Sequence, residues 1–128
     1  MPMLRIMVFG TFDHFHPGHK FVLDEAGKRG EVVVVVATDI HVQQIKGRAP
    51  DQDQSKRISI LQSQYPIYTI ALGDPQDFMV PITHYKPDLI LLGYDQQMPP
   101  GVSIDDLPCP IERLAAFEPE KHKSSLRR

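Results

Sequence analysis

Two histidines, His16 and His19, lie three residues apart in a short segment that also holds Pro17 and Gly18. Proline is favoured in the first turn of a helix, and side chains three residues apart share one helix face, so both imidazoles are expected together at a helix start. Backbone N–H groups and the positive end of the helix dipole lie at the same place, and Gly18 has no side chain to keep an anion away. The spacing therefore predicts a phosphate site whose hydrogen-bond donors can stabilise the negative charge that develops on phosphate oxygens during a reaction.

A metal site is the alternative use of these side chains, with His14, His16 and His19 as ligands. The segment has no nearby cysteine to complete a zinc set, and the positive end of a helix repels a cation, so phosphate is favoured over zinc. For His14 an ordinary role as a hydrogen-bonded core side chain is also open. The glycine spacing of a Rossmann dinucleotide motif and the Gly-Lys-Ser/Thr of a P-loop are both absent from the sequence.

Aspartates follow four of the predicted strands, each shortly after the apolar run ends. Ligands of parallel sheets bind beyond the carboxyl ends of the strands, so Asp13, Asp39 and Asp95 are expected beside one pocket. A structural role in turns or helix caps is equally open for these three residues. For Asp74 the structural role is favoured.

The segments that must position these side chains alternate between strand and helix patterns. Apolar runs predict strands at residues 4–9, 31–37, 67–72, 89–92 and 111–115, and the five valines at 32–36 predict a strand covered on both faces. Helices are predicted at residues 17–29, ended by a left-handed Gly30, and at 53–64 and 77–85, whereas the basic segment 44–48 is predicted to be a loop. The alternation predicts right-handed βαβ units in a three-layer α/β, Rossmann-like fold with a central parallel sheet.

Composition excludes several classes of protein. The 128 residues and 14.5 kDa fit a single domain over residues 1–128, with enough hydrophobic residues to bury a core. A net charge of −2 gives no basic excess for binding nucleic acid, and the longest apolar run, residues 32–37, is too short to cross a membrane. The first residues lack a signal-peptide pattern and the single Cys109 suits a reducing compartment, so a soluble, cytoplasmic protein is expected.

The segment from Gly10 to His19 resembles the signature of the cytidylyltransferase-like nucleotidylyltransferase superfamily, whose hallmark is His-x-Gly-His after the first strand. Other segments fall in the family's order: Thr38-Asp39, Lys46-Gly47-Arg48, Arg57 and Lys123-Ser124-Ser125. Within the superfamily, Lys86-Pro87-Asp88 followed by Leu92-Gly93-Tyr94-Asp95-Gln96 is similar to the archaeal-type FAD synthases, which adenylylate FMN. Glycerol-3-phosphate cytidylyltransferases are the next most similar group.

The resemblance implies an enzyme that transfers a nucleoside monophosphate from a nucleoside triphosphate to a phosphorylated acceptor and releases pyrophosphate. ATP and FMN are the substrates implied first. His16 and His19 would contact the triphosphate, and Lys46 would close over the α-phosphate or the acceptor's phosphate, although on pattern alone Lys46 is equally well explained as a solvated surface charge. Mg²⁺ is expected to bind through the phosphates, with no protein residue assigned as its ligand.

The resemblance also assigns residues that bind the two substrates. Those implied for the nucleotide are Gly10, Thr11, Phe12, Gly18, Arg57, Gly93, Asp95, Ser124 and Ser125. Gly93 and Asp95 would lie beside the base or ribose, and the two serines would hold the β- and γ-phosphates. Arg57 would reach the phosphates or pair with an acidic neighbour on its helix. The residues expected at the acceptor are Asp13, Asp39 and Lys46.

Two other functions stay open at this stage. The first is a CTP-dependent glycerol-3-phosphate cytidylyltransferase, although residues 117–120 lack the arginine that such enzymes place near there. The second is a non-catalytic nucleotide- or flavin-binding module, suggested by a final segment shorter than that of relatives. The expected partners are small molecules, with neither nucleic acid nor membrane involved, and relatives suggest a homodimer.

Overall fold

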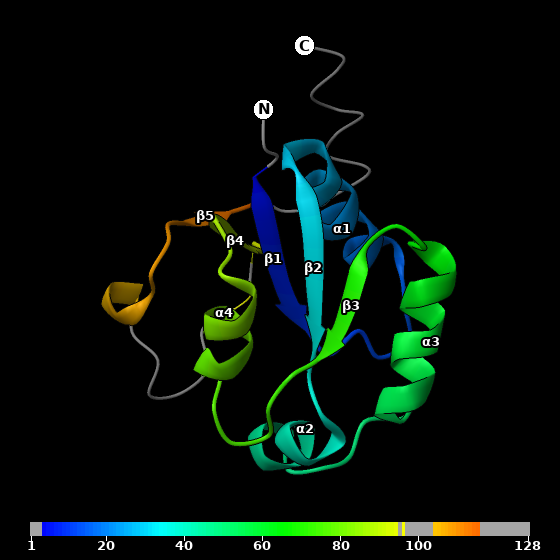
Figure 1. Ribbon diagram of the computed structural model, residues 1–128. Helices are drawn as coiled ribbons and strands as arrows, with labels where there is room; N and C mark the ends of the chain where they lie inside the picture. The colour runs from blue at the N-terminus through cyan, green and yellow to red at the C-terminus, as the bar shows by residue number, and fades with distance from the viewer. Residues whose placement is uncertain (1–3, 95, 97–103, 116–128) are drawn as a thin grey trace.

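Five apolar runs form the strands of one parallel sheet in the computed structural model, which describes residues 4–94, 96 and 104–115 (Figure 1). The strand order is β3-β2-β1-β4-β5, and every neighbouring pair is parallel. The strands are β1 (Arg5–Gly10), β2 (Glu31–Val36), β3 (Thr69–Leu72), β4 (Leu89–Leu92) and β5 (Ile111–Arg113). The order runs one way from β1 to β3 and the other way from β1 to β5, so the chain reverses direction across the sheet between β1 and β4.

Helices cover both faces of the sheet and complete the three layers. Helices α1 (Pro17–Arg29) and α3 (Gln54–Gln64) lie on one face, and α4 (Met79–Tyr85) lies on the other (Figure 1). Helix α2 (Asp39–Lys46) lies beyond the carboxyl ends of the strands, and a short 3₁₀ turn covers Ile104–Asp106. The predicted three-layer α/β fold is therefore confirmed.

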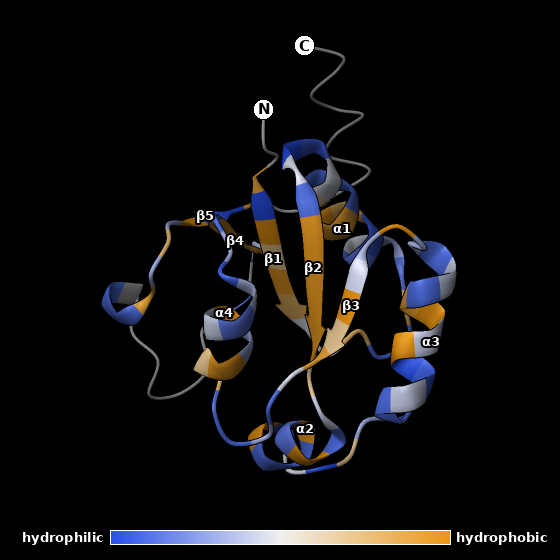
Figure 2. Cartoon of the chain, viewed as in Figure 1, coloured by the Kyte–Doolittle hydropathy of each residue, from blue (hydrophilic) through white to orange (hydrophobic). Residues whose placement is uncertain are grey.

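The valine-rich strand β2 contributes side chains to the hydrophobic cores on both faces of the sheet. Val32, Val34 and Val36 pack in one core with side chains of α1 and α3, whereas Val33 and Val35 pack in the other core with Ile82 of α4. Figure 2 shows this strand and most of β1 as continuous hydrophobic ribbons. Because both faces of β2 are buried, its sequence does not alternate between apolar and polar residues. The prediction of a strand covered on both faces is confirmed.

Helix α1 starts and ends where its sequence signals lie, but its end differs in conformation from the prediction. His16 is the N-cap and Pro17 the first helical residue. Gly30 caps the C-terminus with φ 163°, an extended conformation and not the left-handed one expected. The glycine is needed for space, since a Cβ there would lie 2.2 Å from the carbonyl oxygen of Leu4.

The segment predicted as a basic loop, residues 44–48, instead contains the end of helix α2. The Thr38 hydroxyl caps this helix by accepting from the N–H of His41, and Gly47 ends it with a left-handed φ of 77°. Among its side chains only Val42 is buried, which leaves almost no apolar periodicity to detect. Lys46 is thus the last residue of α2, which lies beyond the carboxyl ends of the strands.

Candidate active site

The side chains of His16 and His19 stack face to face at the start of α1. Their ring centroids lie 3.7 Å apart with 21° between the ring planes. The His16 Nδ1 accepts a hydrogen bond of 3.1 Å from the N–H of Gly18, so this ring also serves as the helix cap. The bond fixes the ring's orientation and leaves Nε2 as the nitrogen open to a ligand. The pairing of the two imidazoles predicted from their spacing is confirmed.

Partial burial makes His19 chemically different from His16. Its ring packs against Phe12 and Phe15, with centroids 5.2 Å and 5.8 Å away, and its buried Nδ1 has no hydrogen-bond partner among the described residues. Desolvation by burial, together with the nearby charges of His16 and Lys46, lowers the pKa of His19 to about 4. His19 is therefore neutral at pH 7.

A cavity of about 810 Å³ opens beside this pair, between the carboxyl ends of β1 and β4. The strand order reverses between these two strands, and such a switch point is where parallel α/β sheets bind ligands. Gly93, Tyr94 and Gln96 line the side that follows β4. The residues that line the other side, from the end of β1, the turn after it and α1, include Gly10, Thr11, Phe12, Asp13, His16, Gly18 and His19. We call this space the histidine cavity.

The turn after β1 is held in an unusual backbone shape. Phe12 and His14 have positive φ values of 56° and 53°. The Phe12 ring lies over Gly10, where an added Cβ would come within 2.8 Å of two ring carbons. Gly10 therefore permits Phe12 to fold back under the turn and pack against His19, which links the glycine to the position of the histidine pair.

Asp13 holds the segment before α3 against this turn. Its two carboxylate oxygens accept from the N–H groups of Asp51 and Gln52 at 2.8 Å and 2.9 Å. Burial acts to raise the pKa of Asp13, but these two N–H donors and the charges of His14 and Arg57 outweigh it, so the pKa lies below its usual value. The carboxylate is charged at neutral pH, lines the histidine cavity, and has both oxygens engaged.

Arg57 is fully buried beneath the turn. Its guanidinium donates to the carbonyl oxygens of Thr11, Ala37 and Gln52 at 2.8–2.9 Å, and to the Asp39 carboxylate at 2.7 Å. Two roles for Arg57 were predicted from the sequence, a contact to phosphate or an ion pair within its own helix. The structure shows an ion pair, but its acidic partner is Asp39, which follows β2 and does not belong to α3. Four N–H groups of Arg57 are thus committed to protein oxygens. Neither Arg57 nor Asp39 is among the residues that line the two cavities in the described part of the chain.

Lys46 and Gln96 occupy the border between the histidine cavity and a second cavity of about 390 Å³, and they line both. Lys46 reaches this border from the end of α2. The side-chain amide of Gln96 donates to the Phe9 carbonyl oxygen at 2.7 Å, and its oxygen accepts from the Gly93 N–H at 3.1 Å. Gln96 thus ties β1 to β4, a role its family motif alone did not reveal.

Several predicted residues do not join the site or cannot be placed. His14 is exposed and bonds Asp51 at 2.8 Å, so the suggested core role is wrong. With Asp13 these two side chains form one cluster of metal-type donors among the described residues, but it lies at the surface and its members already bond one another or nearby N–H groups. Asp95, Ser124 and Ser125 lie outside the described residues.

Comparison with known proteins finds a family model and relatives that this chain resembles. A cytidylyltransferase-like family model matches residues 7–108, which span the turn, the histidine pair and the residues after β4. The chain is 40% identical over 98 residues to the FAD synthase of Methanopyrus kandleri and 40% identical over 95 residues to that of Archaeoglobus profundus. Each match covers 73% of this chain but only 65% and 60% of the relative, so the chain spans less than two thirds of these proteins.

A solved structure has the same fold over nearly its whole length. The structure described as the lipopolysaccharide core biosynthesis protein from Thermoplasma volcanium superposes with a TM-score of 0.78 and 32% sequence identity. The alignment covers 91% of this chain and 99% of that one. Separately, no helix in the described part of the chain is long and apolar enough to span a bilayer.

Proposed function

The chain belongs to the cytidylyltransferase-like family, and from that premise we propose that it transfers the adenylyl group of ATP to the phosphate of FMN. The products are FAD and pyrophosphate. The stacked His16–His19 pair beside the histidine cavity carries the proposal, because two imidazoles at a helix start can donate to phosphate oxygens where the helix dipole also favours an anion. Relatives named FAD synthase support ATP and FMN as the two substrates.

In the proposed reaction an oxygen of the FMN phosphate attacks the α-phosphorus of ATP. The bond from that phosphorus to the bridging oxygen of the β-phosphate breaks, and the electron pair leaves with pyrophosphate. The protein contributes position and charge stabilisation, since no covalent enzyme intermediate is needed. His16, held by its bond to the Gly18 N–H, keeps its other ring nitrogen for a phosphate oxygen. Neutral His19 presents an N–H donor without adding a repelling charge beside His16 and Lys46.

Lys46 is the mobile positive charge of this scheme. It stands at the border that both cavities share, which is where the transferred phosphorus must lie if each cavity holds one substrate. A lysine ammonium on a flexible stem can follow an oxygen from one phosphate to the other as the bond order changes. We therefore assign Lys46 to the α-phosphate and the incoming FMN phosphate.

Nucleotidyl transfer of this kind generally uses a divalent metal ion, and we propose Mg²⁺. The donor set that the described residues place around the histidine cavity fits an ion held mainly by the nucleotide. It offers imidazoles, backbone groups and the carboxylate of Asp13, whose oxygens already accept from two N–H groups. Mg²⁺ prefers phosphate, water and one or two carboxylates to an all-protein cage. When bound, the ion would neutralise charge on the phosphate oxygens.

The test is to incubate the purified full chain with ATP, FMN and Mg²⁺ and to measure FAD by chromatography and pyrophosphate by a coupled assay. We expect both products in equal amounts, and neither in the absence of ATP. CTP with glycerol 3-phosphate serves as the comparison pair, and turnover of that pair alone would overturn the proposal. Gel filtration of the same sample tests the homodimer, which we also propose.

A further inference from the structure

The ring of His19 is held in place by other rings. Its Nδ1 has no hydrogen-bond partner among the described residues, whereas the His16 ring is fixed by the N–H of Gly18. Three rings contact His19 instead: His16 stacks on it at 3.7 Å between centroids, and Phe12 and Phe15 lie 5.2 Å and 5.8 Å away. The orientation of His19 therefore depends on packing, so the loss of a packed ring should let it move.

Phe15 differs from the other two rings because it lines neither cavity of the described chain. His16 and Phe12 line the histidine cavity, so replacing either of them would also change the surface that a substrate meets. Phe15 packs on His19 from outside that lining. A change at Phe15 therefore reaches a bound nucleotide through the His19 ring.

Tyr65, the residue that ends α3, packs against Phe15. The two rings meet edge to face, with centroids 6.3 Å apart and 72° between their planes. The Tyr65 hydroxyl donates to the Asp24 carboxylate at 2.8 Å, and the Lys20 ammonium donates to the same carboxylate at 3.0 Å. Burial and the hydrogen bond to Asp24 raise the pKa of Tyr65, so its hydroxyl stays a donor at neutral pH. Tyr65 is thus tied to α1, the helix that begins at the histidine pair.

We infer that Phe15 and Tyr65 are positioning residues for catalysis, and that their edge-to-face rings hold His19 against His16 at the start of α1. The inference rests on the proposed function and adds to it two residues that line neither cavity of the described chain. The contacts form a closed path, because Phe15 packs on His19, Tyr65 packs on Phe15, and the Tyr65 hydroxyl returns to Asp24 on the helix of His19. A displacement of about 1 Å at a reacting group can cost about 10²-fold in rate, so a small movement of His19 would be felt.

The test follows the His19 ring in the free protein by NMR and then measures the reaction. Phe15→Leu and Tyr65→Leu each remove one ring of the pair. We expect both to raise the titration midpoint of His19 from about 4 toward 6.5, because its ring gains contact with water. The other groups that act on its pKa are unchanged in both variants: His16, Asp13 and Lys46. The kcat for FAD formation should fall about tenfold while both KM values stay within about twofold, since no substrate contact is removed.

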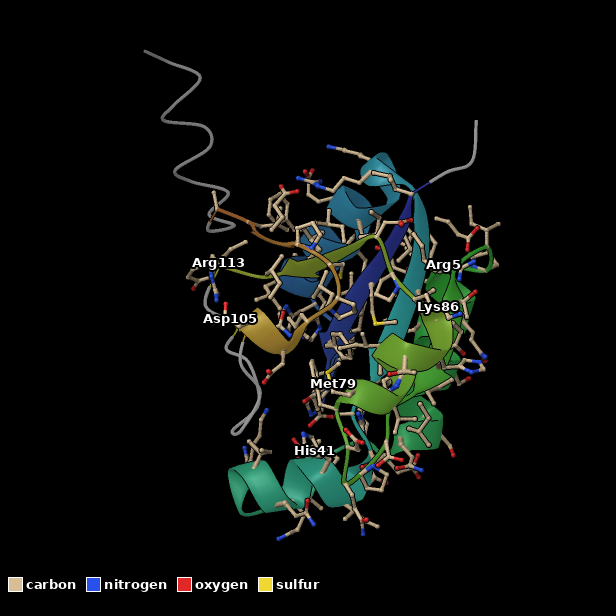
Figure 3. All side chains as sticks on the ribbon, turned by 60° about the vertical axis from the view of Figure 1, so that its left-hand side comes forward. Arg5, His41, Met79, Lys86, Asp105 and Arg113 are labelled. Carbon is tan, nitrogen blue, oxygen red and sulfur yellow. The ribbon has the colours of Figure 1, made fainter. Side chains whose placement is uncertain are left out.

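Tyr85→Leu is the matched control. Tyr85 is also a partly buried tyrosine, but it packs in the core on the α4 face and lines neither cavity of the described chain. Figure 3 shows α4, which carries Met79, in front of the strands. We expect Tyr85→Leu to lower stability to urea without moving the His19 midpoint or kcat. Tyr65→Phe keeps the ring and should retain most of both, and Phe15→Leu carries the test if Tyr65→Leu fails to fold by circular dichroism.

An unchanged His19 midpoint in Phe15→Leu and Tyr65→Leu would overturn the inference, and so would an equal shift in Tyr85→Leu. A raised midpoint with an unchanged kcat would overturn it as well, because the rings would then place His19 without serving catalysis. A raised midpoint in a protein whose wild type forms no FAD would sustain the ring support and overturn only the proposed reaction. FAD formation by the wild type with an unchanged midpoint in both variants would do the reverse.

Discussion

Arg57 and Asp39 form an ion pair at 2.7 Å beneath the turn that follows β1, with the guanidinium completely buried and the carboxylate partly exposed. The same guanidinium bonds the carbonyl oxygens of Thr11 and Ala37, which follow β1 and β2. Three separate segments are thereby joined at the edge of the sheet where the histidine cavity opens. The arginine therefore acts on the site through the backbone of the turn, and its removal should affect both stability and catalysis.

Replacing Arg57 by Met should lower the free energy of unfolding by about 3–5 kcal/mol, because Asp39 and three carbonyl oxygens lose their partner. Urea unfolding followed by circular dichroism measures this change. Lys56→Met is the control, since Lys56 is the exposed neighbour on α3. An Arg57→Met protein as stable as the control variant would show that the buried network contributes little.

The histidine pair should carry most of the catalytic effect. We expect His16→Ala and His19→Ala each to reduce kcat about 10²–10³-fold, the usual cost of removing one donor aimed at developing charge. His84→Ala serves as control, because His84 is exposed in the last turn of α4 and lines neither cavity of the described chain. Steady-state FAD formation gives kcat and KM separately. Unchanged kcat in either variant would remove the basis of the proposed mechanism.

The protonation of His19 can be measured by NMR. Its pKa of about 4 lies below the ordinary 6.5, so its ring resonance should shift with a midpoint near pH 4 in the free protein. The pKa of His14 is raised by its hydrogen bond to Asp51, so in the same spectra His14 should titrate above 6.5. Addition of pyrophosphate, which brings negative charge to the cavity, should raise the midpoint of His19.

The same depressed pKa sets the sign of a stability effect. Between pH 6.5 and about 4 the unfolded chain protonates His19 while the folded chain does not, so stability falls as pH falls through this window. His19→Gln, which cannot titrate, should show a shallower loss of stability over that window. A His19 midpoint near 6.5, or an identical acid dependence in the variant, would contradict the burial argument.

Local signals in the sequence were sufficient for most of the fold. Pro17 at the first position of α1 and the five valines of β2 act through neighbouring residues, and both elements were predicted within a residue. Helix α2 escaped prediction because Ile40 and Ile45 are exposed and only Val42 is buried. Its Thr38 cap and its Gly47 stop were present in the sequence, but without an apolar stripe they indicate a turn as readily as a helix.

The candidate site was predictable only where its residues are close in sequence. His16 lies at the N-cap and His19 in the first turn of α1, so their spacing alone predicted that the two rings share one face, where the structure stacks them. Arg57, by contrast, bonds Thr11 and Asp39 across 46 and 18 residues, and no local pattern contains that information. The second cavity, of about 390 Å³, likewise combines residues from β1, β2, α2 and α4, which only the folded sheet brings together.

Lys46 should affect both substrates, since it lines both cavities. We expect Lys46→Ala to lower kcat/KM for ATP and for FMN by about 10- to 100-fold, because a charge-assisted contact to phosphate is lost, with Lys46→Arg recovering part of it. Lys28→Ala is the matched control at the end of α1, where the lysine pairs with Glu25 away from the site. An effect on one substrate only would place the ammonium inside one cavity and not at their border.

A glycine beside the histidine pair, Gly18 in α1, should separate stability from activity. A Cβ at Gly18 would lie 3.0 Å from Cε1 and 3.1 Å from Nδ1 of His16, so Gly18→Ala must displace the ring that caps α1 and stacks on His19. Alanine is otherwise the better helix residue by about 1 kcal/mol, so the free energy of unfolding should change little while kcat falls. Gly27→Ala is the control in the same helix, because its Cβ meets the Tyr68 hydroxyl, far from the pair, and activity should be retained. The two variants are compared by urea unfolding and by the rate of FAD formation. A Gly18→Ala enzyme with normal kcat would mean that the exact placing of the His16 ring does not matter for catalysis.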